Sequence, residues 1–325
     1  MTMRAAYLAE PGVVAVGRFP IPRPEEGQVL VEMRHASICG SDVHIVFDGF
    51  HDQERLGSPG YPGHEGIGVV AESRSRAFAA GDPVLTVPPV EHTGCFAEYQ
   101  VVDEGSLVPV PREGDLSRLL LAQQLGTTVF GMAKFVDGPP PRTAAVIGAG
   151  SAGLFFMQLL RRMGCESVLV SDLDPGRLVV ADRLGAQVVD ARRAALADTA
   201  REMTGGIGVD LVVEAAGPDA CRVEAVEAVR ERGTIGFFGF PERKGTAPFP
   251  VERAFRKSVR MEWVNGTQKE PGLVSFRRAV DLIRSGEIVV DHCLEHAFDL
   301  GDIAEAFASA RRHGDGHPKV GIILR

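Results

Sequence analysis

The spacing of apolar residues divides the chain into two parts with different patterns. Through residue 110, short apolar and β-branched runs alternate with turns rich in Gly and Pro, the pattern of strands in a small barrel or sandwich. From Thr143 onward, short apolar runs precede longer amphipathic stretches, which is a strand–helix alternation. Such an alternation is typical of βαβ units, so it predicts a parallel, doubly wound sheet and the α/β fold class.

The boundaries of the predicted elements follow from these runs. The predicted strands of the first part are Arg4–Leu8, Val13–Gly17, Val29–Met33, Ile67–Ala71, Pro83–Val87 and Phe96–Val102. The predicted strands of the second part are Thr143–Ile147, Ser167–Ser171, Gln187–Val189, Val209–Glu214, Gly233–Phe238 and Val259–Val264. The predicted helices are Leu116–Gln124, Thr127–Val136, Gly153–Met163, Pro175–Leu184, Ala194–Met203, Pro218–Arg230, Val274–Ser285 and Gly301–Ala310, and Gly321–Leu324 is a last predicted strand.

Charge and composition exclude several classes of partner. The net charge of the 325 residues is −8, and no basic run interrupts it, so nucleic acid and anionic membranes are not expected as partners. The N-terminal residues lack the apolar core of a signal peptide, and no apolar run is long enough to span a membrane. The five cysteines are scattered and odd in number, which favours a reducing compartment. We therefore expect a cytoplasmic location.

A glycine-rich turn joins the first predicted strand of the second part to its helix. Gly148, Gly150 and Gly153 give the GxGxxG spacing, in which the glycines allow a tight turn, close approach of a pyrophosphate and close helix–strand packing. The free N–H groups at the helix start, from Ser151 and Ala152, suit a diphosphate. Because the strand, the helix and an acid on the next strand all agree with the fingerprint, we predict dinucleotide binding.

The acid at the end of the second strand indicates which dinucleotide binds. Asp172 is placed to accept hydrogen bonds from the adenosine ribose hydroxyls and would repel a 2′-phosphate, which favours NAD over NADP. Arg177 could instead reach towards a phosphate. Further on, Ala216 lies in a run of small residues that could line the nicotinamide end, although a simple strand-to-helix turn would look the same.

The first part of the chain carries a possible metal site. Cys39 precedes a polar stretch, Gly40-Ser41-Asp42, which we interpret as a turn, and His64 lies between two glycines. A thiolate and an imidazole are ligands that suit zinc. A catalytic zinc normally has three protein ligands, and Glu65 could be the third or could lie beside the metal. Ser41 and His44, close behind the thiolate, could remove the proton of an alcohol held at the metal.

These motifs resemble those of the medium-chain dehydrogenase/reductase superfamily, and most of all its zinc-dependent alcohol and polyol dehydrogenases. The resemblance covers nearly the whole chain and is carried by Ile38–His44, Gly63–Gly68, Gly81–Val84, Gly94–Tyr99 and Gly148–Gly153 with Asp172. It implies a GroES-like β-barrel catalytic domain, residues 1–126 and 267–325, and a Rossmann domain, residues 127–266, with the active site in the cleft. It also implies that Cys39 and His64 bind a catalytic zinc and that Glu65 is the neighbouring carboxylate.

Within this resemblance, two departures change the expected metal content. The four-cysteine lobe that binds a structural zinc in many members is absent, since Cys95 is the one cysteine in this region, so we expect one catalytic zinc and no structural zinc. Polyol members have a Glu at the third ligand position, where this chain has Gln123. Its amide oxygen could still bind zinc, but the site loses one negative charge.

The resemblance implies an oxidoreductase that transfers a hydride between a secondary alcohol, such as a polyol, sugar or cyclitol, and NAD. Ser41 would take the alcohol proton, and His44 would pass it on through the cofactor ribose. We expect a small-molecule substrate and a homo-oligomer, a dimer or a tetramer. Two alternatives stay open: a zinc-free enone or quinone reductase that uses NAD(P)H, and a non-catalytic NAD-binding protein.

Overall fold

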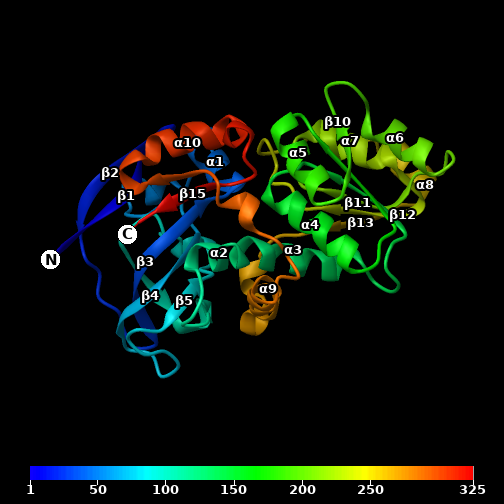
Figure 1. The fold of residues 1–325 in the computed structure, drawn as a ribbon. Helices are drawn as coiled ribbons and strands as arrows, with labels where there is room; N and C mark the ends of the chain where they lie inside the picture. Colours follow the sequence, from blue (N-terminus) through cyan, green and yellow to red (C-terminus); the bar gives the residue numbers. More distant parts are fainter. Residues whose placement is uncertain (325) are drawn as a thin grey trace. The chain divides into compact units, whose positions relative to one another are not determined.

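The computed structural model describes residues 1–324, so Arg325, the last residue of the predicted first domain, lies outside the described part of the chain. The chain forms two compact units, one formed by Met1–Gly126 with Gln268–Arg325 and the other by Thr127–Thr267. Figure 1 shows the ribbon of both units, with labels on many of the helices and strands. Each unit is described by itself below.

The first unit is built on a mixed sheet of seven strands in the order β14-β15-β3-β4-β5-β7, with β6 paired to β3. The last strand of the chain, β15, pairs antiparallel with β3, so segments from the two ends of the sequence lie side by side (Figure 1). A separate antiparallel hairpin consists of β1 and β2. The strands are β1 (Thr2–Glu10), β2 (Val13–Pro20), β3 (Gln28–Ile38), β4 (Glu65–Ser73), β5 (Pro83–Thr86), β6 (Tyr99–Asp103), β7 (Leu107–Pro109), β14 (Ala297–Asp299) and β15 (Val320–Ile323).

The apolar core of the first unit lies between the sheet and its helices, and both contribute side chains to it. Val29, Val31 and Met33 of β3 are fully buried, as the alternation of the strand predicts, and they belong to one cluster with Ala306 and Phe307 of α10. The stretch Gly40-Ser41-Asp42 is the first turn of helix α1, so our interpretation of it as a polar turn was wrong. The helices are α1 (Gly40–Phe47), α2 (Leu116–Leu120), α9 (Val274–Arg284) and α10 (Ile303–Arg311), and α3 (Ala122–Phe135) begins in this unit.

The second unit has a six-stranded sheet in the order β10-β9-β8-β11-β12-β13. Every neighbouring pair is parallel, which confirms the doubly wound sheet predicted from the strand–helix alternation. The central strands are continuous apolar runs because helices cover them; all of Ala144–Ile147 is buried. The strands are β8 (Thr143–Ile147), β9 (Ser167–Asp172), β10 (Gln187–Asp190), β11 (Val209–Glu214), β12 (Val229–Phe237) and β13 (Arg260–Trp263).

The helices of the second unit differ from the predicted ones at several ends, and one helix was not predicted. Strand β12 begins at Val229, so the predicted helix ending at Arg230 is two residues too long. Helix α8 was not predicted, because its short sequence has exposed apolar residues, Val251 and Phe255, and no buried stripe. The helices are α4 (Ser151–Arg162), α5 (Pro175–Arg183), α6 (Leu196–Met203), α7 (Asp219–Ala228) and α8 (Val251–Lys257).

The strand order of the second unit has a switch point at β8 and β11. The chain leaves β8 for β9 and β10 on one side, then returns to β11 on the other side of β8. In open α/β sheets, ligands bind outside the carboxyl ends of the strands at such a switch point. The carboxyl ends of β8 and β11, Ile147 and Glu214, lie opposite each other there.

Candidate metal and cofactor sites

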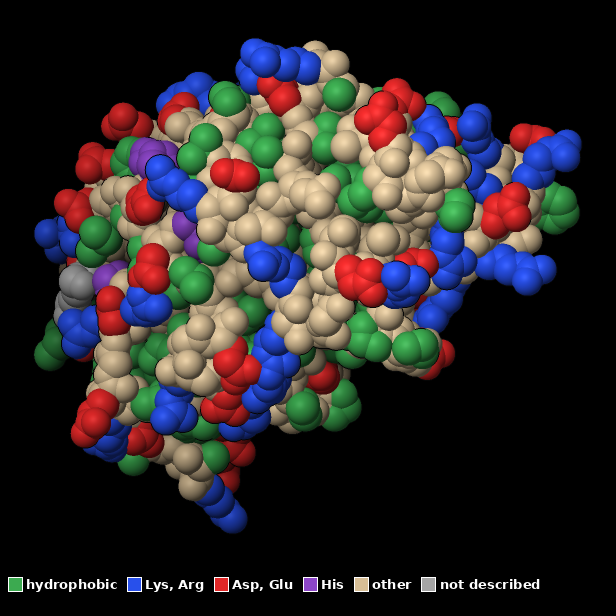
Figure 2. Space-filling view, turned by 45° about the vertical axis from the view of Figure 1, so that its right-hand side comes forward, with side chains coloured by type: hydrophobic (Ala, Val, Ile, Leu, Met, Phe, Trp, Pro, Cys, Tyr) green, Lys and Arg blue, Asp and Glu red, His purple; other side chains and the backbone are tan. Residues whose placement is uncertain are grey.

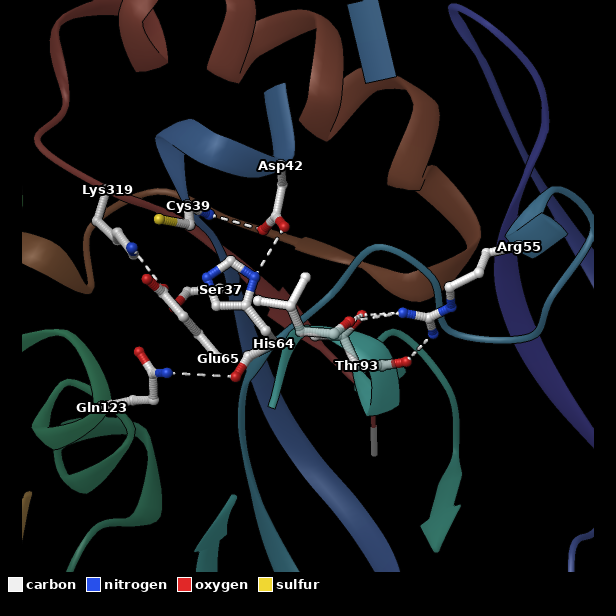
Figure 3. Close-up of polar contacts among 10 residues, drawn as sticks. Ser37, Cys39, Asp42, Arg55, His64, Glu65, Thr93, Gln123 and Lys319 are labelled. Atoms are coloured by element: carbon white, nitrogen blue, oxygen red, sulfur yellow. Dashed lines mark hydrogen bonds and ion pairs between the residues drawn. The ribbon is translucent and has the colours of Figure 1, made fainter. Parts of the chain in front are cut away.

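Cys39, His64 and Glu65 come together at one end of the β3–β4 pair. Strand β3 ends one residue before Cys39, and β4 begins one residue after His64, with Ser37 opposite Glu65 in the antiparallel register. One ligand atom from each of the three side chains lies within 4.8 Å of the others. Figure 3 shows the three side chains pointing towards one another. The pairing of two strands therefore assembles a set of S, N and O donors that suits zinc.

Asp42 is a candidate site residue that the sequence analysis did not single out. Its side chain is fully buried, and its Oδ2 accepts a hydrogen bond from the N–H of Cys39 at 2.9 Å. Cys39 is the N-cap of α1, and Asp42 is the acid three residues later. Its Oδ1 lies 2.9 Å from Nδ1 of His64. A carboxylate on one ring nitrogen fixes the imidazole and leaves the other nitrogen for a metal, as at many zinc sites. The spacing Cys39-x-x-Asp42 is the capping-box spacing, and it was the available signal.

The charge around His64 fits a cation. Burial alone would lower the pKa of His64, but the Asp42 carboxylate and the Cys39 sulfur together raise it well above its usual value. The chain thus surrounds this imidazole with groups that favour positive charge. A divalent metal at the same place would meet the same favourable surroundings, so the residues present fit zinc.

The carboxylate of Glu65 already has two partners, Ser37 and Lys319. Ser37 Oγ donates to its carboxylate at 2.5 Å, and Lys319 Nζ lies 2.5 Å from the same oxygen, Oε2. Burial would raise the pKa of Glu65, but the Lys319 ammonium outweighs this and lowers it. Burial would likewise lower the pKa of Lys319, which the Glu65 carboxylate raises instead. The carboxylate is therefore an ion paired with Lys319, as Figure 3 shows.

Lys319 was also missed, and no sequence motif marks it. It precedes β15, and the pairing of Val320 with Ile38 carries it to the metal ligands from the far end of the chain. Its ammonium also donates to the amide oxygen of Gln124 at 3.2 Å. Gln123, at the start of α3, is buried, and its amide N–H donates to the carbonyl of His64 at 3.4 Å. Both ends of the first unit thus supply polar groups around His64 and Glu65.

The two residues predicted to move a proton lie on α1. Ser41 and His44 are three residues apart, so they lie on the same face of the helix, and both are half-buried. Nδ1 of His44 lies 2.7 Å from the carboxylate of Asp48, the residue that follows the helix. The sequence analysis did not connect Asp48 with His44, although the spacing of four residues along a helix was the signal.

In the second unit, the Gly148–Gly153 turn has the geometry of a phosphate cradle. Gly148 has a φ of +100°, which other residues rarely adopt, and a Cβ on Gly153 would lie 1.8 Å from the carbonyl oxygen of Gly148. Helix α4 begins at Ser151, and its N-cap, Gly150, provides no side-chain cap. The N–H groups in the first turn of a helix have no partner within the helix, so this helix start suits an anion. These residues fit a dinucleotide diphosphate.

The structure places the remaining predicted cofactor residues near this turn or on the next helix. Asp172 ends β9 and accepts the N–H groups of Ala149 at 2.6 Å and Asp174 at 2.8 Å. A Cβ on Gly148 would lie 3.2 Å from that of Ala216, so Ala216 borders the turn. Arg177 lies in the first turn of α5, where its own N–H is 3.2 Å from the Asp174 carboxylate.

Comparisons with known proteins agree with this arrangement. Residues 25–112 match the family model described as "Alcohol dehydrogenase GroES-like domain", and residues 152–284 match "Zinc-binding dehydrogenase". The chain belongs to the medium-chain dehydrogenase/reductase superfamily.

Relatives of this dehydrogenase match over almost the full length. An L-threonine 3-dehydrogenase of Bacillus velezensis is 27% identical, with 90% of this chain and 91% of the relative covered. A D-xylulose reductase A of Aspergillus oryzae is 26% identical, with 89% and 88% covered. The solved structure of the alcohol dehydrogenase TADH from Thermus sp. ATN1 is 25% identical, covers 99% of this chain and 100% of its own, and gives a TM-score of 0.85.

The segment of the dehydrogenase between β5 and β6 is short, and hydrogen bonds from Arg55 join it to the loop after α1. Arg55 donates to the carbonyl of Val90 at 2.9 Å, to Oγ1 of Thr93 at 2.6 Å and to the Thr93 carbonyl. Arg55 and Thr93 appear together in Figure 3. Cys95, in the same segment, is fully buried, and burial raises its pKa well above the usual value. Arg55 therefore has a structural role in joining these loops.

The surface of the dehydrogenase carries both signs of charge. On the face seen in Figure 2, acidic and basic side chains are interspersed. Among residues 1–324, no helix combines the length and the apolar character needed to cross a membrane.

Proposed function

We propose that this dehydrogenase oxidises a secondary alcohol of the polyol class with NAD, using a zinc ion held by Cys39 and His64. The convergence of the Cys39, His64 and Glu65 ligand atoms within 4.8 Å carries the proposal, because a zinc-free reductase needs no such set. The name of the Aspergillus oryzae relative, a D-xylulose reductase, supports a polyhydroxylated substrate.

Gln123 is the third protein ligand in this proposal, and Glu65 is an adjacent carboxylate. The 2.5 Å ion pair with Lys319 favours this choice, since moving Glu65 onto a metal would leave the buried ammonium without its partner. The Gln123 amide N–H donates to His64, which leaves the amide oxygen for the metal. Cys39 is then the one anionic ligand.

The side chains of α1 remove the proton of the alcohol. When bound, zinc supplies a Lewis acid for the alcohol oxygen, and the nicotinamide ring of NAD supplies the hydride acceptor. Ser41 accepts the hydroxyl proton while donating its own to His44, and His44 releases a proton towards solvent. Asp42 keeps the His64 ring in one orientation throughout. The alcohol loses one hydride and one proton.

Asp172 supports NAD as the cofactor. A carboxylate can accept about four hydrogen bonds, and the two backbone N–H groups leave capacity for the ribose hydroxyls. A 2′-phosphate would meet negative charge at the same place.

We further propose a cytoplasmic homo-oligomer, a dimer or a tetramer. The five cysteines are free thiols, which suits a reducing compartment. Light scattering of the purified protein measures the oligomeric state.

A cofactor-reduction screen tests the proposed function. Purified protein with one zinc per chain should reduce NAD, followed at 340 nm, with xylitol, sorbitol or 2-butanol as the alcohol. Cys39→Ala should lose the zinc and the activity, whereas Cys221→Ala, which removes a thiol of the second unit, should keep both. Active protein without zinc, or full activity of Cys39→Ala, would instead support the zinc-free reductase.

A further inference from the structure

Residues that follow α1 contact both the imidazole and the backbone carbonyl of His44. Nδ1 lies 2.7 Å from the Asp48 carboxylate, and the His44 carbonyl accepts the N–H groups of Asp48 at 3.0 Å and Phe50 at 3.4 Å. The Phe50 ring packs edge-on against the imidazole, with ring centroids 6.0 Å apart. The orientation of the ring is therefore fixed by the end of the helix and the turn after it.

The contact with Asp48 decides which ring nitrogen can accept a proton. A carboxylate can only accept hydrogen bonds, so the nitrogen that faces it carries the hydrogen. In neutral His44, the proton is then on Nδ1, and Nε2 is the nitrogen that can accept a proton. Without Asp48, both tautomers become available, and the Nε2–H form cannot accept a proton from its neighbour.

Water reaches the pair that His44 forms with Asp48. His44 lies in the last turn of α1, and both side chains are partly exposed, at 23% for His44 and 38% for Asp48. The proton can therefore leave for solvent.

We propose that Asp48 is a positioning residue of the proton relay, which keeps His44 in the Nδ1–H tautomer with Nε2 as the proton acceptor. This inference rests on the proposed function of Ser41 and His44. Asp48 acts through His44 and needs no contact with substrate. The same logic, an acid that holds a histidine in one tautomer, operates in the Ser-His-Asp triad.

Asp48→Asn tests the proposal, because the amide can also donate to Nδ1 and so releases the other tautomer. In single-turnover experiments, NADH formation should slow about tenfold, less than the ~10²–10⁴-fold effect of a proton-transfer group itself. The dissociation constant of NAD and the zinc content should not change, and Asp48→Glu should recover part of the rate. Asp103→Asn is the matched control, since Asp103 lies 3.6 Å from His92 Nδ1 elsewhere in the unit.

Two further measurements separate positioning from a structural role. In a His44→Ala background, Asp48→Asn should have no additional effect, whereas a structural effect would multiply with that of His44→Ala. The imidazole ¹⁵N chemical shifts of His44, assigned with His44→Ala, should indicate Nδ1–H in the unmodified protein and a mixture in Asp48→Asn. Rate effects of the two substitutions that multiply, or unchanged ¹⁵N shifts, would overturn the proposal. If the unmodified protein oxidises no alcohol, the proposed function itself fails.

Discussion

Lys319 and Glu65 form a fully buried ion pair beside the proposed metal ligands, although 254 positions separate them in the sequence (319 − 65 = 254). Two charges removed from water are stable only as a pair, so each depends on the other. Ser37 donates a hydrogen bond to Glu65, and the amide oxygen of Gln124 accepts one from Lys319. The last strand of the chain thus fixes the charge of the residue next to His64.

Lys319→Met should destabilise the metal-free protein by about 3 kcal/mol, because it leaves the Glu65 carboxylate buried without a counter-charge. Zinc should restore most of this loss, since Glu65 is then free to bind the metal. Lys319→Arg, which keeps the charge, is the control. Urea unfolding with and without zinc measures both effects. Equal unfolding midpoints for Lys319→Met and the unmodified protein would contradict the prediction.

Gln123→Glu should slow the loss of zinc. With Cys39 as the one anionic ligand, the proposed site has a net charge of +1, and a second anionic ligand lowers this charge and strengthens binding. Dialysis against a chelator should strip activity from the unmodified protein readily, and added zinc should restore it. Metal analysis over time follows the loss. Gln187→Glu adds the same charge on β10 of the second unit and should not change the rate.

The parts of the molecule that local sequence signals determine were predicted well. The strand Thr143–Ile147, the glycine turn and α4 follow one another within twenty residues, so the GxGxxG spacing and the apolar periodicity contain most of the information. The prediction of a parallel sheet succeeded for the same reason, because the strand–helix alternation is also a local pattern. The end of α7 was misplaced because Val229 continues the apolar pattern of the helix while it already belongs to β12.

The surroundings of the proposed ligands were harder to predict. Cys39, His64 and Glu65 were found from their residue types, and the structure brings them together. The interpretation of Gly40-Ser41-Asp42 as a turn gave too much weight to its polarity, since an acid such as Asp42 is also favourable in the first turn of a helix. The position of Lys319 beside Glu65 depends on strand pairing between the two ends of the chain, and no local pattern encodes that pairing.

Asp172→Gly should weaken NAD binding about tenfold or more, the effect of losing charged hydrogen bonds to the ribose hydroxyls. Affinity for NADP should fall less or rise, because the repulsion of a 2′-phosphate is also removed. Calorimetric titration with each cofactor measures the ratio of the two dissociation constants. Asp190→Asn, which alters an acid at the end of the neighbouring strand β10, should leave the ratio unchanged. A preference for NADP in the unmodified protein would refute the assignment.

Ser41→Ala should reduce the rate of alcohol oxidation by ~10²–10⁴-fold, the range for a positioned proton-transfer group. Zinc content and NAD affinity should stay the same, because the hydroxyl takes no part in binding either. Single-turnover rates of NADH formation report the step directly. Ser58→Ala, in the loop after α1, is the control substitution. An unchanged single-turnover rate in Ser41→Ala would remove Ser41 from the relay.

His292 should make the protein less stable in mild acid. Its side chain is buried, at 8% exposure, and burial lowers the pKa to about 4 from the usual 6.5. Between these two values the unfolded chain binds more protons than the folded one, so stability falls as the pH drops below 6.5 and the full loss is reached below 4. At pH 5 the loss from this residue is about 2 kcal/mol.

His292→Leu should reduce the difference in unfolding free energy between pH 7 and pH 5 by that amount, whereas His313→Leu, at an exposed histidine, should leave it unchanged. Urea unfolding at the two pH values checks this, and an equal pH dependence of His292→Leu and the unmodified protein would show that His292 is charged in both states or in neither.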